Sequence, residues 1–65
     1  MSMRDLRDIN NILEVAEDTT KYPRLALILV KKKAEELSTK LEDAGIYGET
    51  LEQLNNAQYR LDIAI

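Results

Sequence analysis

The chain of 65 residues contains no cysteine, histidine, tryptophan or phenylalanine. Without cysteine it forms no disulfide, and without cysteine or histidine it lacks the ordinary ligands of a zinc site. Without Trp and Phe, its hydrophobic core must be largely aliphatic. A domain of this length buries only about 60% of its unfolded surface, so oligomerisation is the remaining common source of stability. We therefore expect one domain over residues 1–65 that forms a homo-oligomer and holds no metal or cofactor.

Residues for catalysis are also scarce. The serines, Ser2 and Ser38, have no base at a recognisable spacing, and neither His nor Cys is available as a nucleophile or base. The neighbouring carboxylates Glu35 and Glu36 point about 100° apart on a helix, whereas acid–base or two-metal chemistry needs carboxylates that converge across a cleft. We expect a protein that is not an enzyme.

Long hydrophobic segments are missing as well. The longest apolar run, Leu25 to Val30, has six residues, far fewer than the ~20 that span a bilayer. The N-terminal residues mix acids and bases and lack the apolar segment of a secretory signal. We expect a cytoplasmic protein with no membrane partner. Its net charge of -3 also disfavours binding to a long nucleic acid.

Apolar residues recur at intervals of three and four along most of the chain, which places them on one face of a helix. Pro23 suits the first helical position, and Gly45 suits the left-handed conformation that closes a helix. The segment Thr50 to Gln53 matches a capping box, so a third helix begins near Thr50 or one turn earlier, at Gly48. The predicted helices cover about residues 3–18, 23–44 and 49–64.

The connection of about five residues between the second and third predicted helices favours antiparallel neighbours. The predicted fold is therefore all-α: a short N-terminal helix followed by an antiparallel helical hairpin, in a homo-oligomeric helical bundle. The run from Leu25 to Val30 is apolar all around its helix, and surface left uncovered there marks an interface between copies. An antiparallel hairpin brings the C-terminus to the same end. The predicted interface comprises Leu25, Ile28, Leu29, Ile63 and Ile65.

A cluster of cations surrounds this apolar run, and no acid occurs between Thr19 and Ala34. The simpler interpretation is a solvated helix face paired with Glu35 and Glu36. The alternative is an anion site, because Arg24 lies at a helix start that favours phosphate and the Tyr22 ring offers a stacking surface for a base. The candidate ligand-binding residues are Tyr22, Arg24, Lys31, Lys32 and Lys33. The three lysines span about 200° of helix surface, so they cannot all face one pocket of one protomer.

Three segments also occur in a known family: Tyr22-Pro23 before the long helix, Ile28 to Lys32 as an aliphatic and basic stretch, and Lys33 to Leu37 as Lys-Ala-x-Glu-Leu. With Ala57 and Ile65 in the last helix, residues 22–65 resemble the phage anti-CBASS sponges, small helical-hairpin proteins that sequester cyclic nucleotide signals of bacterial immunity. The chain departs from that family at Tyr59-Arg60, where a Met-Trp pair is usual.

The resemblance implies a viral protein of the host cytoplasm that acts in counter-defence. It further implies a compact homo-oligomer that binds a cyclic dinucleotide between protomers and does not cleave it. Two other hypotheses follow from the residues alone. One is a protein-binding inhibitor or adaptor that places the apolar end of the second helix in a groove of a host protein. The other is a structural oligomer that has no small-molecule ligand.

Overall fold

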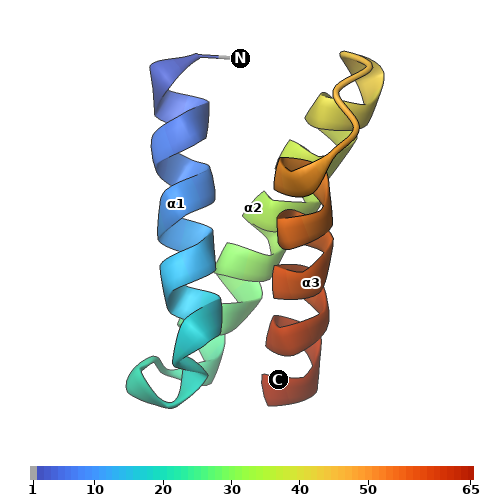
Figure 1. Ribbon diagram of the computed structural model, residues 1–65. Coiled ribbons are helices and arrows are strands. Elements are labelled where there is room, and N and C mark those ends of the chain that lie inside the picture. Colours follow the sequence, from blue (N-terminus) through green and yellow to red (C-terminus); the bar gives the residue numbers. More distant parts are fainter. Residues whose placement is uncertain (1) are drawn as a thin grey trace.

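The computed structural model describes residues 2–65, which form three α-helices and one short 3₁₀-helix, with no strand in that range. In chain order they are α1 (Met3–Glu17), η1 (Thr19–Lys21), α2 (Arg24–Asp43) and α3 (Glu49–Ala64). The chain direction reverses between α1 and α2 and again between α2 and α3, as Figure 1 shows. The all-α fold class is therefore confirmed, and the helix ends lie within about one residue of those expected.

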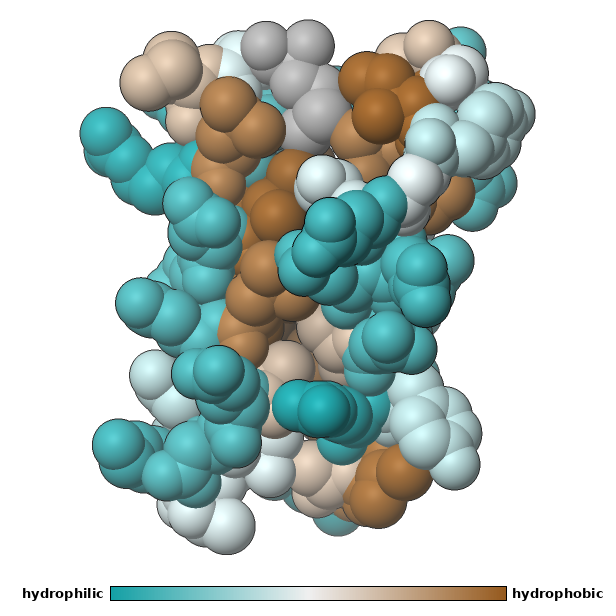
Figure 2. Space-filling model, viewed as in Figure 1, coloured by the Kyte–Doolittle hydropathy of each residue, from teal (hydrophilic) through white to brown (hydrophobic). Residues whose placement is uncertain are grey.

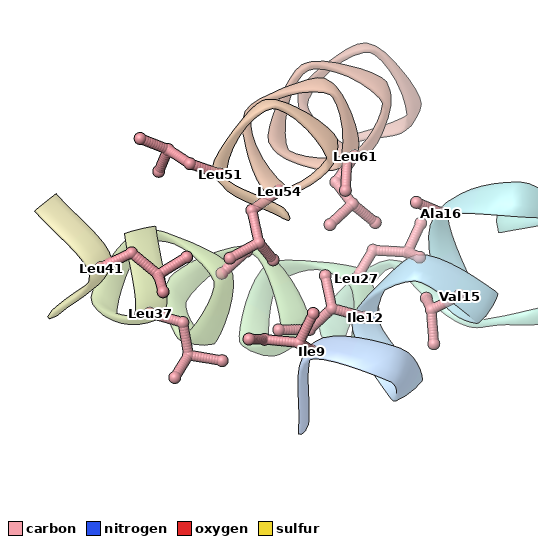
Figure 3. Packing of buried hydrophobic residues seen from close by; sticks show 12 residues of the cluster. Ile9, Ile12, Val15, Ala16, Leu27, Leu37, Leu41, Leu51, Leu54 and Leu61 are labelled. Carbon is pink, nitrogen blue, oxygen red and sulfur yellow. The ribbon is translucent and has the colours of Figure 1, made fainter. Parts of the chain in front are cut away.

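The hydrophobic core lies along the axis of the bundle and takes side chains from all three helices (Figure 3). Helix α1 contacts both α2 and α3, so it belongs to the core as fully as they do. All the core residues are aliphatic, as the absence of Trp and Phe requires. They are Ile9, Ile12, Val15, Ala16, Leu27, Ala34, Leu37, Leu41, Leu51, Leu54, Ala57 and Leu61.

Helix α1 begins with a capping box that is also tied to α2. The Ser2 hydroxyl accepts a hydrogen bond from the Asp5 N–H at 3.1 Å, and Asp5 Oδ2 accepts one from the Ser2 N–H at 3.3 Å. Lys40 Nζ of α2 donates to the same Oδ2 at 3.2 Å. The hydrogen bond from Lys40, followed by that from the Ser2 backbone, lowers the pKa of Asp5, which is only 6% exposed. A buried carboxylate thus joins the start of α1 to the last turn of α2.

The two ends of α2 follow from its flanking residues. Pro23 has extended backbone angles and serves as the N-cap, so α2 begins at Arg24, one residue later than the start predicted from proline's preference for the first helical position. At the other end Gly45 has φ +72°, and the Ile46 N–H donates to the Leu41 carbonyl at 2.9 Å. A second bond joins the Gly45 N–H to the Glu42 carbonyl at 3.0 Å, which completes a Schellman motif. The left-handed conformation predicted for Gly45 is confirmed.

Helix α3 does not begin with the predicted capping box at Thr50. Its N-cap is Gly48, whose φ of 158° and ψ of -153° fall in a region that essentially only glycine occupies. The helix therefore starts at Glu49, and Thr50 lies inside its first turn. The Gly48 carbonyl accepts the first helical bond from Glu52 at 3.0 Å. The capping-box prediction was wrong because glycine allows the turn to close earlier, which matches the alternative start at Gly48.

The core predicts a sharp contrast between two leucine truncations. Leu54→Ala removes a side chain that is 0% exposed, and we expect it to lower the free energy of unfolding by about 2–5 kcal/mol. Leu29→Ala truncates an exposed side chain on α2, and at low protein concentration it should cost less than about 0.5 kcal/mol. Urea unfolding followed by circular dichroism measures both. Similar losses in the two variants would contradict the assignment of Leu54 to the core.

The pair between Asp5 and Lys40 predicts a pH-dependent contribution to stability. Because the pKa of Asp5 is lower in the folded chain than its ordinary 3.8, the pair stabilises the fold fully above that value, and this stabilisation is lost as the pH falls through the folded pKa. Asp5→Asn should therefore destabilise the protein at neutral pH, and its deficit against the unsubstituted chain should shrink below pH ~4.

Thermal melting from pH 7 to pH 2 measures this deficit. Asp8→Asn is the matched control, because Asp8 lies on the same helix and contacts Lys33 only at 3.9 Å. A deficit of Asp5→Asn that stays constant down to the lowest pH would refute the proposed electrostatic origin.

Candidate ligand and interaction surface on α2

Two of the three consecutive lysines are held by carboxylates of the neighbouring helices. Lys31 Nζ lies 2.7 Å from Asp62 Oδ1 of α3. Lys33 Nζ lies 3.9 Å from Asp8 Oδ2 of α1 and 3.6 Å from Glu36 Oε2 of its own helix. The lysines therefore diverge toward opposite flanks of α2, as 100° per residue requires.

Lys31 is the more firmly placed of these two lysines. Its side chain is 29% exposed, and it donates the 2.7 Å hydrogen bond to Asp62. That hydrogen bond raises the pKa of Lys31 above its ordinary value. The contact joins the first half of α2 to the last turn of α3 and so brings the C-terminal end of the chain beside the apolar run. Lys31 is thus committed mainly to a contact between helices.

Arg24 and Lys32 differ from the other cations of this stretch. Lys21 lies 3.8 Å from Asp18, whose carboxylate also accepts a hydrogen bond from the Thr20 hydroxyl at 2.6 Å. By contrast, no carboxylate of residues 2–65 lies within 4.0 Å of Arg24 or Lys32. Both side chains are exposed. Of the five cations, these two are available to an external anion.

Tyr22 lies directly before the start of α2 and is 39% exposed. Its backbone is extended, and its N–H donates to the Thr19 carbonyl at 3.3 Å. Pro23 follows as an N-cap with no side chain that accepts a hydrogen bond, so the N–H groups of the first turn have no capping acceptor. Tyr22 and Arg24 therefore flank a helix start whose dipole and free donors favour an anion.

The predicted interface residues divide into exposed and half-buried groups. Leu25 is 75% exposed and Leu29 is 67% exposed, while Leu27 between them is buried. Ile63 of α3 is also exposed. Ile28 and Ile65 are half-buried, and Ile65 packs against the core. The strongest apolar exposure on α2 is therefore the pair Leu25 and Leu29, four residues apart on the face that points away from the core.

Two features of the structure were not identified from the sequence. One is the set of carboxylates that neutralise the lysines, Asp62 and Asp8. The other is a polar cluster between α2 and α3, where the Gln58 amide donates to the buried Ser38 hydroxyl at 2.6 Å and Ser38 donates to Asn55 Oδ1 at 3.4 Å. All these contacts join residues between 17 and 31 positions apart in the chain. Helix periodicity alone does not pair such distant positions.

A groove between α1 and α3 was also not predicted. Its volume is ≈ 280 Å³, and its polar lining residues are all exposed. Figure 2 shows this face of the molecule, where a strip of hydrophobic residues runs between α1 and α3 with hydrophilic side chains on both sides. The lining residues are Leu13, Ala16, Glu17, Gln53, Asn56, Ala57 and Arg60.

Comparison with known proteins gives no relative: no protein-family model, curated protein or solved structure matches the chain. The resemblance to cyclic-nucleotide sponges thus stays a prediction. None of the helices formed by residues 2–65 combines the length and apolar character needed to cross a bilayer. Within the same residues, no group of three or more acidic, His or Cys side chains is arranged to hold a metal ion.

Proposed function

We propose that this chain is a non-catalytic binding protein that acts as a homo-oligomer and sequesters a small anionic ligand of the cyclic nucleotide class. The observation that carries the proposal is the exposed, unpaired Arg24 beside Tyr22 at an uncapped helix start. Such a helix start attracts phosphate, and an adjacent aromatic ring stacks on a base. The proposal also takes up the resemblance of residues 22–65 to the phage sponges.

The candidate residues have different roles in this proposal. Arg24 and Lys32, which lack a carboxylate partner, meet the phosphates, and Tyr22 meets a base. Lys31 and Lys33 add positive potential from the flanks while they hold α3 and α1 in place. Tyr22 and Arg24 lie at the end of the bundle where α2 begins, and Lys32 lies about 12 Å farther along α2. A ligand of modest size suits this arrangement, because the net charge of -3 repels an extended polyanion.

Self-association is the second part of the proposal, and the exposed leucines support it. Leu25 and Leu29 leave a large apolar area on a chain of only 65 residues. Covering them with another copy adds buried apolar area that a small core lacks. The same exposed leucines also favour a second candidate, in which a host protein with an apolar groove covers them instead.

Ligand binding is tested by thermal melting with a panel of cyclic di- and trinucleotides. A ligand present at 100 times its dissociation constant adds about 2.7 kcal/mol to the free energy of unfolding, which corresponds to a rise in Tm of about 10–20 °C for a domain of this size. Arg24→Glu should abolish the rise because it removes the unpaired cation and adds a charge that repels phosphate.

Arg4→Glu is the matched control. Arg4 is exposed and lies in the first turn of α1, so the substitution makes the same change of net charge in the same kind of helix position. It lies at the opposite end of the bundle from the start of α2 (Figure 1). This variant should keep the full rise in Tm. If no nucleotide raises the Tm, sequestration is refuted and the protein-binding candidate is favoured. If Arg24→Glu and Arg4→Glu lose the rise in Tm equally, the effect comes from net charge and not from a site at Arg24.

A further inference from the structure

The outer face of α2 carries a ridge in which apolar and charged side chains follow one another. Leu25, Leu29, Lys32 and Glu36 are spaced by four, three and four residues, so they form one row along the helix. All four are exposed. We call this row the α2 ridge. Leu27, which is buried, lies about 200° around the helix from both Leu25 and Leu29. The α2 ridge therefore points directly away from the core.

The α1–α3 groove lies on the other side of the bundle. Because α2 packs against both α1 and α3, its outer face points away from both of them. In Figure 1, α1 and α3 stand in front and the paler ribbon of α2 lies behind them. The α2 ridge and the α1–α3 groove are thus separate surfaces that face opposite sides of one molecule.

The floor of the α1–α3 groove is built from small and aliphatic residues. Ala16 and Ala57 are buried, and Leu13 is half-buried beside them. Small residues on two adjacent helices leave a depression between the larger side chains, and ridges of a third helix pack into such depressions. A row with leucines four residues apart, like the α2 ridge, has the spacing that this packing uses.

Charges on the two surfaces are complementary in sign. The rim of the α1–α3 groove carries one carboxylate, Glu17, and one guanidinium, Arg60, and neither has an ionic partner within 4.0 Å among residues 2–65. The α2 ridge carries one cation, Lys32, which has no ionic partner within the same residues, and one carboxylate, Glu36, which lies 3.6 Å from Lys33 of the same helix. When the α2 ridge enters the α1–α3 groove, Lys32 can therefore meet Glu17 on the α1 wall. Glu36 can likewise meet Arg60 on the α3 wall. Such rim charges mainly set orientation and partner choice.

A small molecule fits the α1–α3 groove less well than a protein ridge does. Pockets for small ligands bury roughly 70–90% of the ligand surface. Here the four polar residues at the rim are all exposed, so a small ligand would stay largely in water. They are Glu17, Gln53, Asn56 and Arg60. A helix that runs along the groove instead covers the hydrophobic strip seen in Figure 2 over much of its length.

We infer that the α2 ridge of one copy docks in the α1–α3 groove of the next, so that the chain assembles head to tail. This inference rests on the self-association in the proposed function and specifies its geometry. Because the two surfaces point in opposite directions, the contact is heterologous and produces a stack, or a ring if the rotation between copies closes. A standard interface buries about 800 Å² per partner, roughly a sixth of the 4644 Å² surface of one copy, so each copy has room for both contacts.

Disulfide cross-linking tests the contact. Because the chain contains no cysteine, only the introduced thiols can form a disulfide. Leu29→Cys places a thiol on the α2 ridge, and Asn56→Cys places one at the rim of the α1–α3 groove. Both positions are exposed, so the fold tolerates the substitutions. A disulfide needs Cα atoms within about 7 Å, so it reports close contact. Asn11→Cys, on an exposed position of α1 that belongs to neither surface, is the control.

Mild oxidation of the Leu29→Cys and Asn56→Cys variants mixed together should give a mixed disulfide at a yield at least about tenfold above that of either variant alone or of Asn11→Cys. The double variant should give a ladder of covalent species at successive multiples of 7.5 kDa under non-reducing conditions. A ladder arises only if each copy offers both surfaces to different neighbours.

Two other outcomes separate this inference from the proposed function. If Leu29→Cys alone forms a homodimer as readily as the mixture does, α2 packs on α2 about a two-fold axis, so the head-to-tail arrangement fails while self-association stands. If no pair exceeds the Asn11→Cys control and the unsubstituted chain elutes as a monomer, self-association and the head-to-tail arrangement both fail. Nucleotide binding is then decided by the melting experiment alone.

Discussion

The geometry of one helix constrains the rest of this structure: Leu25, Leu27 and Leu29 cannot all be buried by the same neighbours. A rotation of 100° per residue places Leu27 about 200° from the other two. Helices α1 and α3 cover the side of Leu27, and the leucines on either side of it are left in water. With a fully aliphatic core and no disulfide, the chain needs all three helices around Leu27. The exposed leucines are the direct consequence of that packing.

Folding also determines which cations remain free. Lys31 and Lys33 stand on the two flanks of α2, where Asp62 of α3 and Asp8 of α1 lie within reach. Lys32 stands between them on the outer face, away from both carboxylates. A stretch that reads as one basic cluster in the sequence thus becomes two structural ion pairs and one free lysine in the fold. The unpaired Arg24 lies with Tyr22 at the uncapped start of α2, which is why the proposed anion site is centred there.

The helices could be predicted from the sequence because apolar spacing, Pro23 and Gly45 each act within a few residues. The start of α3 was predicted less well, since Thr50 and Gly48 offer competing starts and only the backbone angles decide between them. The ion pair between Lys31 and Asp62 joins positions 31 residues apart, which no local rule specifies. The α1–α3 groove likewise depends on how Ala16 and Ala57 face each other across two helices. Local signals therefore gave the elements, while the surfaces between elements required the fold.

The head-to-tail assembly inferred above accounts for an apolar ridge on one side of the bundle and an apolar groove on the other. Two-fold pairing of α2 would cover the leucines but leave the hydrophobic strip between α1 and α3 in water, whereas head-to-tail docking covers both surfaces with a single kind of contact. It also leaves Arg24 to one side, because Arg24 lies about 100° around the helix from Leu25. In the proposed arrangement Tyr22 and Arg24 therefore stay accessible to an anion, whereas Lys32 lies within the contact between copies.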